Sequence, residues 1–110
     1  MGATFEFSLT DNSELVKQAL PEAKARALEM VGLQVQGYAQ MLAPVDTGRL
    51  RNSIAHEVID DTAYIGSNVE YAVYQEMGTS KMAAHPYLRP AVQDHLDEYR
   101  RMIEETLKNA

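Results

Sequence analysis

A long apolar stripe between Pro21 and Pro44 constrains the fold more than any other feature of this sequence. Apolar side chains recur there at alternating spacings of three and four, as along one face of a helix: Leu28, Val31, Val35, Tyr38 and Leu42. Pro21 suits the first turn of a helix, and Pro44 disfavours helical geometry at the residue before it. Gly32 and Gly37 each cost a helix interior about 1 kcal/mol. They indicate either close approach of another backbone or local tolerance. The pattern predicts a helix over residues 21–42 with one buried face.

Shorter patterns surround this helix. Residues 5–9 alternate as in a half-buried strand, and residues 53–59 and 62–67 predict a hairpin that turns at Asp60 and Asp61. A capping box at Asp11 and Glu14 predicts a short helix through residue 20. Asn68 is expected to cap a helix over residues 69–77, with Gly78 as its left-handed stop and residues 79–85 as a loop.

A second stripe, framed by Pro86 and Pro90, predicts a long last helix. Its apolar positions are Leu88, Val92, Leu96, Tyr99, Ile103 and Leu107. Two long amphipathic helices can cover one face of a small antiparallel sheet. The sequence therefore predicts a single α+β domain over residues 1–110.

Length, charge and composition narrow the class of protein. A compact domain of 110 residues has a radius of gyration of about 13 Å. The absence of cysteine excludes disulfides and thiolate metal sites. No signal peptide and no membrane-spanning apolar run is recognisable, which predicts a soluble chain in the cytoplasm.

The net charge of −6 divides evenly along the sequence. Residues 1–42 carry five acids and three bases, residues 43–90 carry six acids and four bases, and residues 91–110 carry five acids and three bases. This balance argues against tight binding to a phosphate backbone and against an acidic or basic tail.

No residue constellation predicts catalysis, a cofactor or a metal. His56, His85 and His95 lack the spacing of a helical zinc site, and no serine sits in a nucleophile elbow. Residues 78–81 (GTSK) resemble the end of a phosphate-binding loop but lack its upstream glycine and following helix. A small hydrolase or metal enzyme using His56, Asp60 or His85 is retained as an alternative.

Arginines and tyrosines offer the remaining candidates for binding. Arg49, Arg51 and Arg89 flank loop boundaries, where they are either solvated or paired with carboxylates within the subunit or across an interface. Tyr64, Tyr71, Tyr74 and Tyr87, with Met77 and Met82, suit either a core or a protein interface.

Two segments resemble a known family. Residues 43–54 (APVDTGRLRNSI) resemble the conserved segment of the gene-product-ten-like family of a lambdoid siphophage, whose members are neck, tail-completion or minor tail proteins. Residues 71–82 (YAVYQEMGTSKM) and 84–91 (AHPYLRPA) match its second conserved stretch, in which a Tyr-rich helix ends in Gly-Thr and a Pro-aromatic-Leu-Arg-Pro-Ala run opens the last helix. Tyr87 stands where phenylalanine is common. The resemblance extends from about residue 13 to residue 108.

The resemblance implies a non-enzymatic assembly protein of a phage or prophage virion. Such a subunit would form a ring at the head–tail junction, contact neighbouring neck or tail proteins and let DNA pass without holding it. It would reside in the host cytoplasm during assembly and then in the virion. A cytoplasmic adaptor that binds proteins through its helices is a further alternative. The signature or interface residues are Asp46, Thr47, Gly48, Arg49, Arg51, Tyr74, Gly78, Thr79, Lys81, Met82 and Arg89.

Local chemistry assigns roles within the first segment. Asp46 or Thr47 can cap one further helical turn, and Gly48 permits a sharp entry into it. Leu50 and Ile54 are expected to anchor this turn on the core. We expect Arg51 to support the fold through a carboxylate pair, and Arg49 to be freer to meet a partner.

Overall fold

The computed structural model describes residues 4–8, 17–43 and 48–109. Asp11 and Glu14, which were expected to form a capping box, lie outside these ranges. Of the short helix expected there, residues 17 and 18 are described, and both are helical.

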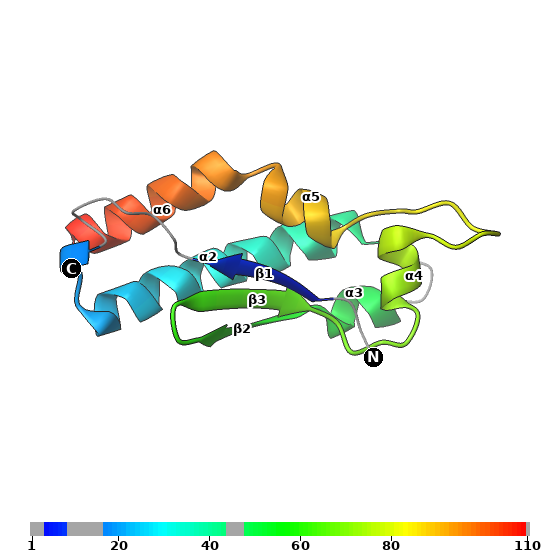
Figure 1. Cartoon of the computed structure of the whole chain (residues 1–110), viewed down its shortest axis with the longest axis horizontal. Coiled ribbons are helices and arrows are strands. Elements are labelled where there is room, and N and C mark those ends of the chain that lie inside the picture. The colour runs from blue at the N-terminus through cyan, green and yellow to red at the C-terminus, as the bar shows by residue number, and fades with distance from the viewer. Residues whose placement is uncertain (1–3, 9–16, 44–47, 110) are drawn as a thin grey trace.

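The elements follow the predicted α+β order and form an elongated molecule of 49 × 20 × 19 Å (Figure 1). Its radius of gyration is 15.0 Å, above the expectation for a compact chain of this length. The elements are β1 (Thr4–Ser8), α2 (Pro21–Leu42), α3 (Arg49–Ser53), β2 (Ala55–Ile59), β3 (Thr62–Gly66), α4 (Ala72–Met77), α5 (Leu88–Gln93) and α6 (Leu96–Lys108). No helix in the described part is long and apolar enough to cross a membrane.

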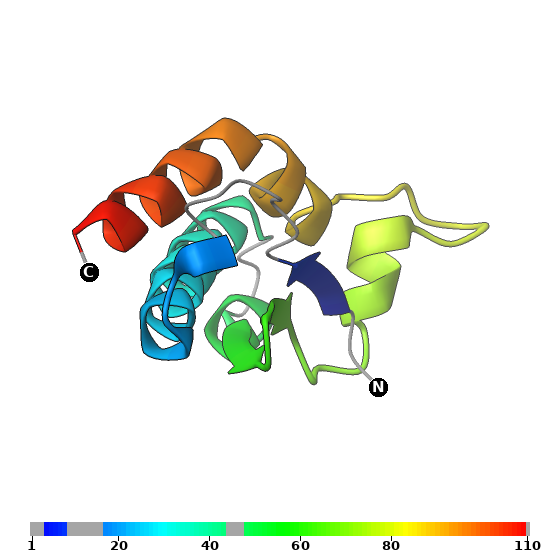
Figure 2. The same ribbon diagram turned by 60° about the vertical axis from the view of Figure 1, so that its left-hand side comes forward.

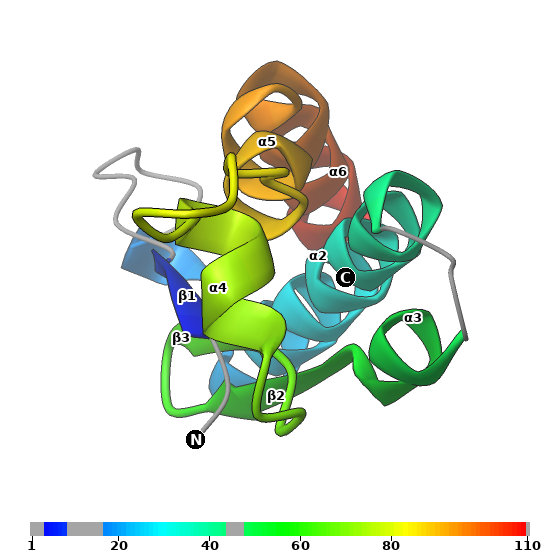
Figure 3. The same ribbon diagram turned by 90° about the vertical axis from the view of Figure 1, so that its right-hand side faces the viewer.

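The three strands form an antiparallel sheet in the order β1-β3-β2. The hairpin of β2 and β3 turns at Asp60, which has a φ of 54°, a left-handed value that aspartate tolerates better than most residues. His56 pairs with Ile65 and Glu57 with Tyr64, so His56 lies on the α2 side of the sheet and Glu57 on the other side. The helices α2, α5 and α6 lie to one side of the sheet (Figure 3).

Helix α2 is the centre of the core. It contacts β2 and β3 on one side and α5 and α6 on another (Figure 2). Its predicted stripe is buried at Leu28, Val31 and Val35, which confirms those positions. Leu42 is 48% exposed, so the prediction was wrong at the last turn.

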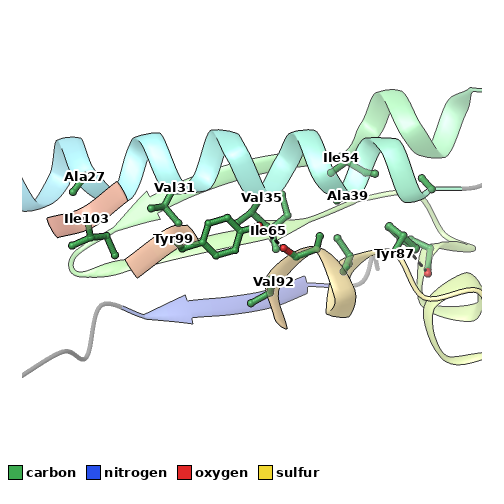
Figure 4. Packing of buried hydrophobic residues seen from close by; sticks show 14 of the residues in the cluster. Ala27, Val31, Val35, Ala39, Ile54, Ile65, Tyr87, Val92, Tyr99 and Ile103 are labelled. Atoms are coloured by element: carbon green, nitrogen blue, oxygen red, sulfur yellow. Dashed lines mark hydrogen bonds between the residues drawn. The ribbon is translucent and has the colours of Figure 1, made fainter. Parts of the chain in front are cut away.

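Alanines complete the buried face of α2, and the sequence pattern did not single them out. Ala23, Ala27 and Ala39 are almost fully buried. Ala27 lies beside Ile103 of α6, and Val35 lies beside Tyr99 and Ile65 (Figure 4). Small side chains let the neighbouring helix approach closely, because less volume separates the two backbones.

The predicted last helix is divided into α5 and α6. A continuous helix would pair the Ala91 carbonyl with the amide of His95, four residues later. In the structure this carbonyl accepts a hydrogen bond from the Tyr99 hydroxyl. The direction of the chain changes at Asp94 and His95, and Leu96 becomes 43% exposed. Helix α6 then packs chiefly on α2, while α5 reaches β1.

A close contact at Gly32 explains one of the two glycines within α2. An ideal Cβ at Gly32 would lie 2.7 Å from Cδ2 of the His56 ring, so the close neighbour is a side chain rather than the expected backbone. The ring is held at both nitrogens: Nδ1 is 2.5 Å from Gln36 Oε1, and Nε2 is 2.5 Å from Glu29 Oε1. At Gly37 a Cβ would meet nothing within 4 Å, which matches local tolerance.

These two glycines form a matched pair for a stability test. Gly37→Ala should raise the free energy of unfolding by about 0.5–1 kcal/mol, because alanine favours the helix and has open space there. Gly32→Ala should lower it by about 1–2 kcal/mol, because the His56 ring must move and lose its two hydrogen bonds. Urea unfolding followed by circular dichroism measures both. Equal effects of the two substitutions would contradict this account of Gly32.

Candidate functional site: the loop end

The two signature segments meet at one end of the molecule. We call this end, formed by residues 48–53 and 68–91, the loop end (Figure 3). Arg49 Nη2 lies 3.3 Å from Glu70 Oε1, and the Arg49 guanidinium lies 5.8 Å from the centroid of the Tyr71 ring. Segments separated by about twenty residues in the sequence are thereby brought together.

Helix α3 begins at a glycine with special geometry. Gly48 has a φ of 75° and a ψ of −9°, a left-handed conformation that side chains disfavour. This agrees with the predicted sharp entry. Leu50 and Ile54 are both buried, which confirms that they anchor the turn. Asp46 and Thr47, the expected caps, lie outside the described residues.

Among the described residues, Arg49 rather than Arg51 has a carboxylate partner. Arg49 makes the carboxylate pair, although both partners are largely exposed and such a pair contributes about 0–1 kcal/mol. Arg51 is exposed in the last turn of α3, and no carboxylate pairs with it among the described residues. The carboxylate pair of Arg51 and the freedom of Arg49 to meet a partner stay predictions, because residues 44–47 lie outside the described ranges and Arg49 is largely exposed.

A chain of hydroxyl groups joins α3 to the segment before α4. Ser53 Oγ donates to the Leu50 carbonyl at 2.6 Å and lies 2.5 Å from Ser67 Oγ. Because each hydroxyl has a single proton, Ser67 must donate to Ser53. Ser67 Oγ also accepts from the Val69 amide at 3.1 Å.

Two element boundaries differ from the prediction. Ser53, predicted as the start of a strand, is the last residue of α3. Helix α4 starts at Ala72 rather than at residue 69, and Asn68 does not cap it.

Glu76 is the residue at this end that sequence reasoning missed. Its side chain is buried, and its carboxylate accepts three backbone hydrogen bonds: from Tyr87 at 2.9 Å, Leu88 at 2.8 Å and Arg89 at 3.1 Å. These amides open α5, where a helix has no carbonyl partners of its own. Nothing local could have revealed this role, because eleven residues separate Glu76 from Tyr87.

Other contacts hold the same junction. The Tyr87 hydroxyl donates to the Ala72 carbonyl at 3.2 Å, and the His85 amide donates to the Gln75 carbonyl at 2.7 Å. Burial, with the nearby charge of Glu76, raises the pKa of Tyr87 from 10.0 to about 12. Gly78 has a φ of 76°, which confirms a glycine stop, but its ψ of 177° is extended rather than left-handed helical. A Cβ at Gly78 would lie 2.8 Å from the Ala84 amide nitrogen.

Between these fixed ends, residues 78–86 form a projecting loop (Figures 1 and 2). Thr79 and Met82 exchange backbone hydrogen bonds of 2.8 and 3.4 Å, and Thr79 Oγ1 accepts from the Lys81 amide at 3.2 Å. The loop agrees with the sequence prediction. Around it the exposed fractions are high for apolar side chains: 53% at Tyr74, 68% at Met77 and 36% at Met82. The side chains of Thr79, Lys81 and Arg89 are also exposed.

The histidines considered for catalysis lie in different surroundings. His56 contacts α2 through Glu29 and Gln36, and His85 is exposed in the projecting loop. The His95 ring stacks on Tyr38 at 3.7 Å, and the Tyr38 hydroxyl donates to Glu98 at 2.7 Å, which raises the pKa of Tyr38. Within the described ranges no group of three His, Asp or Glu side chains could hold a metal ion. The hydrolase alternative therefore gains no assembled site in the described part of the chain.

Comparison with known proteins identifies the family of this chain. A family model described as "Bacteriophage HK97-gp10, putative tail-component" matches residues 8–78. The chain belongs to this HK97-gp10-like family of phage tail components. No curated protein and no solved structure matches it. The match covers α2, the hairpin and α4, and ends at Gly78, where the projecting loop begins.

The Glu76 carboxylate should be the most sensitive position of the loop end. Glu76→Ala leaves three amides at the start of α5 without their acceptor, so the free energy of unfolding should fall by about 2–4 kcal/mol. The matched control is Glu70→Ala, six residues earlier, which removes an exposed pair and should change stability by less than about 0.5 kcal/mol. Urea unfolding compares the two variants. A loss at Glu76 no larger than that at Glu70 would contradict the assigned role.

Proposed function

We propose that this chain is a structural component of a phage or prophage particle that assembles into a ring at the head–tail junction and completes or joins the tail there. Family membership supports a tail component. The observation that carries the finer proposal is the loop end, where both signature segments combine into one exposed surface. A surface with partly exposed tyrosine and methionine side chains is typical of a protein interface.

The structural role needs no catalytic residue. The described polar clusters have evident packing tasks: Glu76 binds the start of α5, His56 joins β2 to α2, and Glu98 binds Tyr38. A small chain that presents different surfaces to neighbouring copies can close into a ring. Assembly would also stabilise a domain of only 110 residues, because a chain of this length buries a smaller share of its surface than a longer one.

The charges support a channel that DNA passes rather than one that grips it. The chain has a net charge of −6, and tight binding to a duplex normally needs a continuous basic face. Its expected partners are further copies of itself and adjacent neck or tail proteins, first in the host cytoplasm and then in the particle.

Electron microscopy tests the ring directly. Negative-stain images across a concentration series should show closed rings of uniform diameter, alone or together with the neighbouring tail proteins encoded beside it. Because many weak contacts close a ring cooperatively, the rings should emerge over a narrow range of concentration. Persistent monomers in the presence of all neighbouring tail proteins would contradict the proposal.

A further inference from the structure

Two exposed surfaces of this chain differ in charge, and their tips point to opposite ends of the long axis (Figure 1). The first is the loop end. The second is the outer face of the β2–β3 hairpin, which faces away from α2 and which we call the outer hairpin face: Ala55, Glu57, Ile59 and Tyr64, with Asp60 and Asp61 at its turn. The turn points toward the end of the molecule where α2 begins, and the projecting loop points the other way (Figure 1).

The loop end is cationic within an acidic protein. Its residues 48–53 and 68–91 contain four basic residues and two acidic ones, a net charge of +2. One of the acids, Glu76, is buried and already bound to backbone amides. Lys81 stands exposed in the projecting loop, close in sequence to the exposed Met77 and Met82. This concentration of positive charge at one end did not stand out in the sequence, because the net charge is the same in each of its three large regions.

The outer hairpin face has the opposite character. Residues 54–67 contain three acids, Glu57, Asp60 and Asp61, and no lysine or arginine, a net charge of −3. Ile59 is 49% exposed, and Tyr64 is half-buried directly across from Glu57. A shallow hollow of about 540 Å³ is lined by Glu57 and Tyr64 of this face and by Asn68, where the face adjoins the loop end. An apolar loop that carries a lysine would fit this face, because its apolar side chains would pack on Ile59 and Tyr64 while its lysine lies near the carboxylates.

We propose that the projecting loop of one copy docks on the outer hairpin face of the next copy. Met77 and Met82 would pack on Ile59 and Tyr64, and Lys81 would face Glu57 and the acidic turn. This inference rests on the proposed self-assembly and names the two surfaces that make it. Because these surfaces differ, the contact is heterologous and propagates head to tail.

Charge complementarity is the reason to choose a second copy as the occupant. Opposite potentials on one chain attract the correct ends of two copies and repel like ends, which sets the order of subunits. Within one copy the docking cannot occur, because the Glu76 contacts hold the loop so that it points away from the hairpin turn. Exposed charges are screened over about 8 Å at physiological ionic strength, so raised salt should weaken the contact.

Cysteine crosslinking tests this contact, since the natural chain contains no cysteine. A chain with both Ile59→Cys and Met82→Cys, treated at millimolar concentration with a short bis-maleimide, should yield a ladder of covalent dimers, trimers and larger species. Each single-cysteine variant can give at most a dimer. The matched control carries Met82→Cys with Leu33→Cys, where Leu33 is an exposed residue of α2, and should give no ladder.

Charge reversal adds a second measurement in the same assay. Lys81→Glu should lower the yield of the ladder about tenfold or more, because it places like charges together. Adding Glu57→Lys to that chain should restore the yield. Lys108→Glu, at the end of α6, is the control for a general change in net charge and should leave the yield unchanged.

The outcomes separate this inference from the proposed function. A ladder with rescue by the double reversal supports the docking. Rings seen by microscopy without an Ile59–Met82 ladder overturn the docking and leave the ring intact. A ladder that never closes into rings, even with the neighbouring tail proteins, supports the docking and overturns the ring. Absence of any ladder, or an equal ladder from the Leu33 control, overturns the inference.

Discussion

The carboxylate of Glu76 is the interaction on which the loop end depends. Helix α5 begins directly after an exposed loop, and its first amides have no carbonyl partners within the helix. One buried side chain from α4 supplies acceptors for three of them. Burying a carboxylate is costly, and the three N–H groups offset that cost because hydrogen bonds to a charged acceptor are strong.

Several neighbouring features follow from this contact. Glycine is needed at position 78, because the chain turns back so closely that a Cβ would meet the backbone of Met82 and Ala84. Tyr87 and Leu88 are then fully buried at the junction of α4 and α5. The backbone of the loop is held at both ends. A surface organised before binding loses less conformational entropy when a partner arrives. Such organisation suits the assembly surface that we propose for this chain.

Local patterns predicted most of the fold. The stripe over residues 21–42 predicted α2 with its bounds, and alternation predicted the strands, because both patterns follow from the periodicity of one buried face. The break between α5 and α6 could not be predicted, since it depends on a hydrogen bond from the Tyr99 hydroxyl to the Ala91 carbonyl of α5, eight residues earlier. Leu42 was misassigned because a periodic pattern does not show where a neighbouring element ends.

The candidate site was predicted in outline only. Its two segments were recognised by resemblance, and Gly48 and Gly78 were expected at turns, which the structure confirms. The partner of Arg49 and the role of Glu76 depend on contacts between residues distant in sequence, and no spacing rule contains them. The opposite charges of the loop end and the outer hairpin face were also not predicted. Acidic and basic residues that balance within one region of the sequence lie on different surfaces of the fold.

Hydrogen exchange measures the central interaction most directly. Native-state exchange of the amides of Tyr87, Leu88 and Arg89 should require global unfolding, with the same opening free energy as the central amides of α2 around Val31 and Val35. The account predicts this equality although α5 follows an exposed loop. Exchange of these three amides through local opening, at a free energy well below that of α2, would contradict the claim that Glu76 fixes the start of α5.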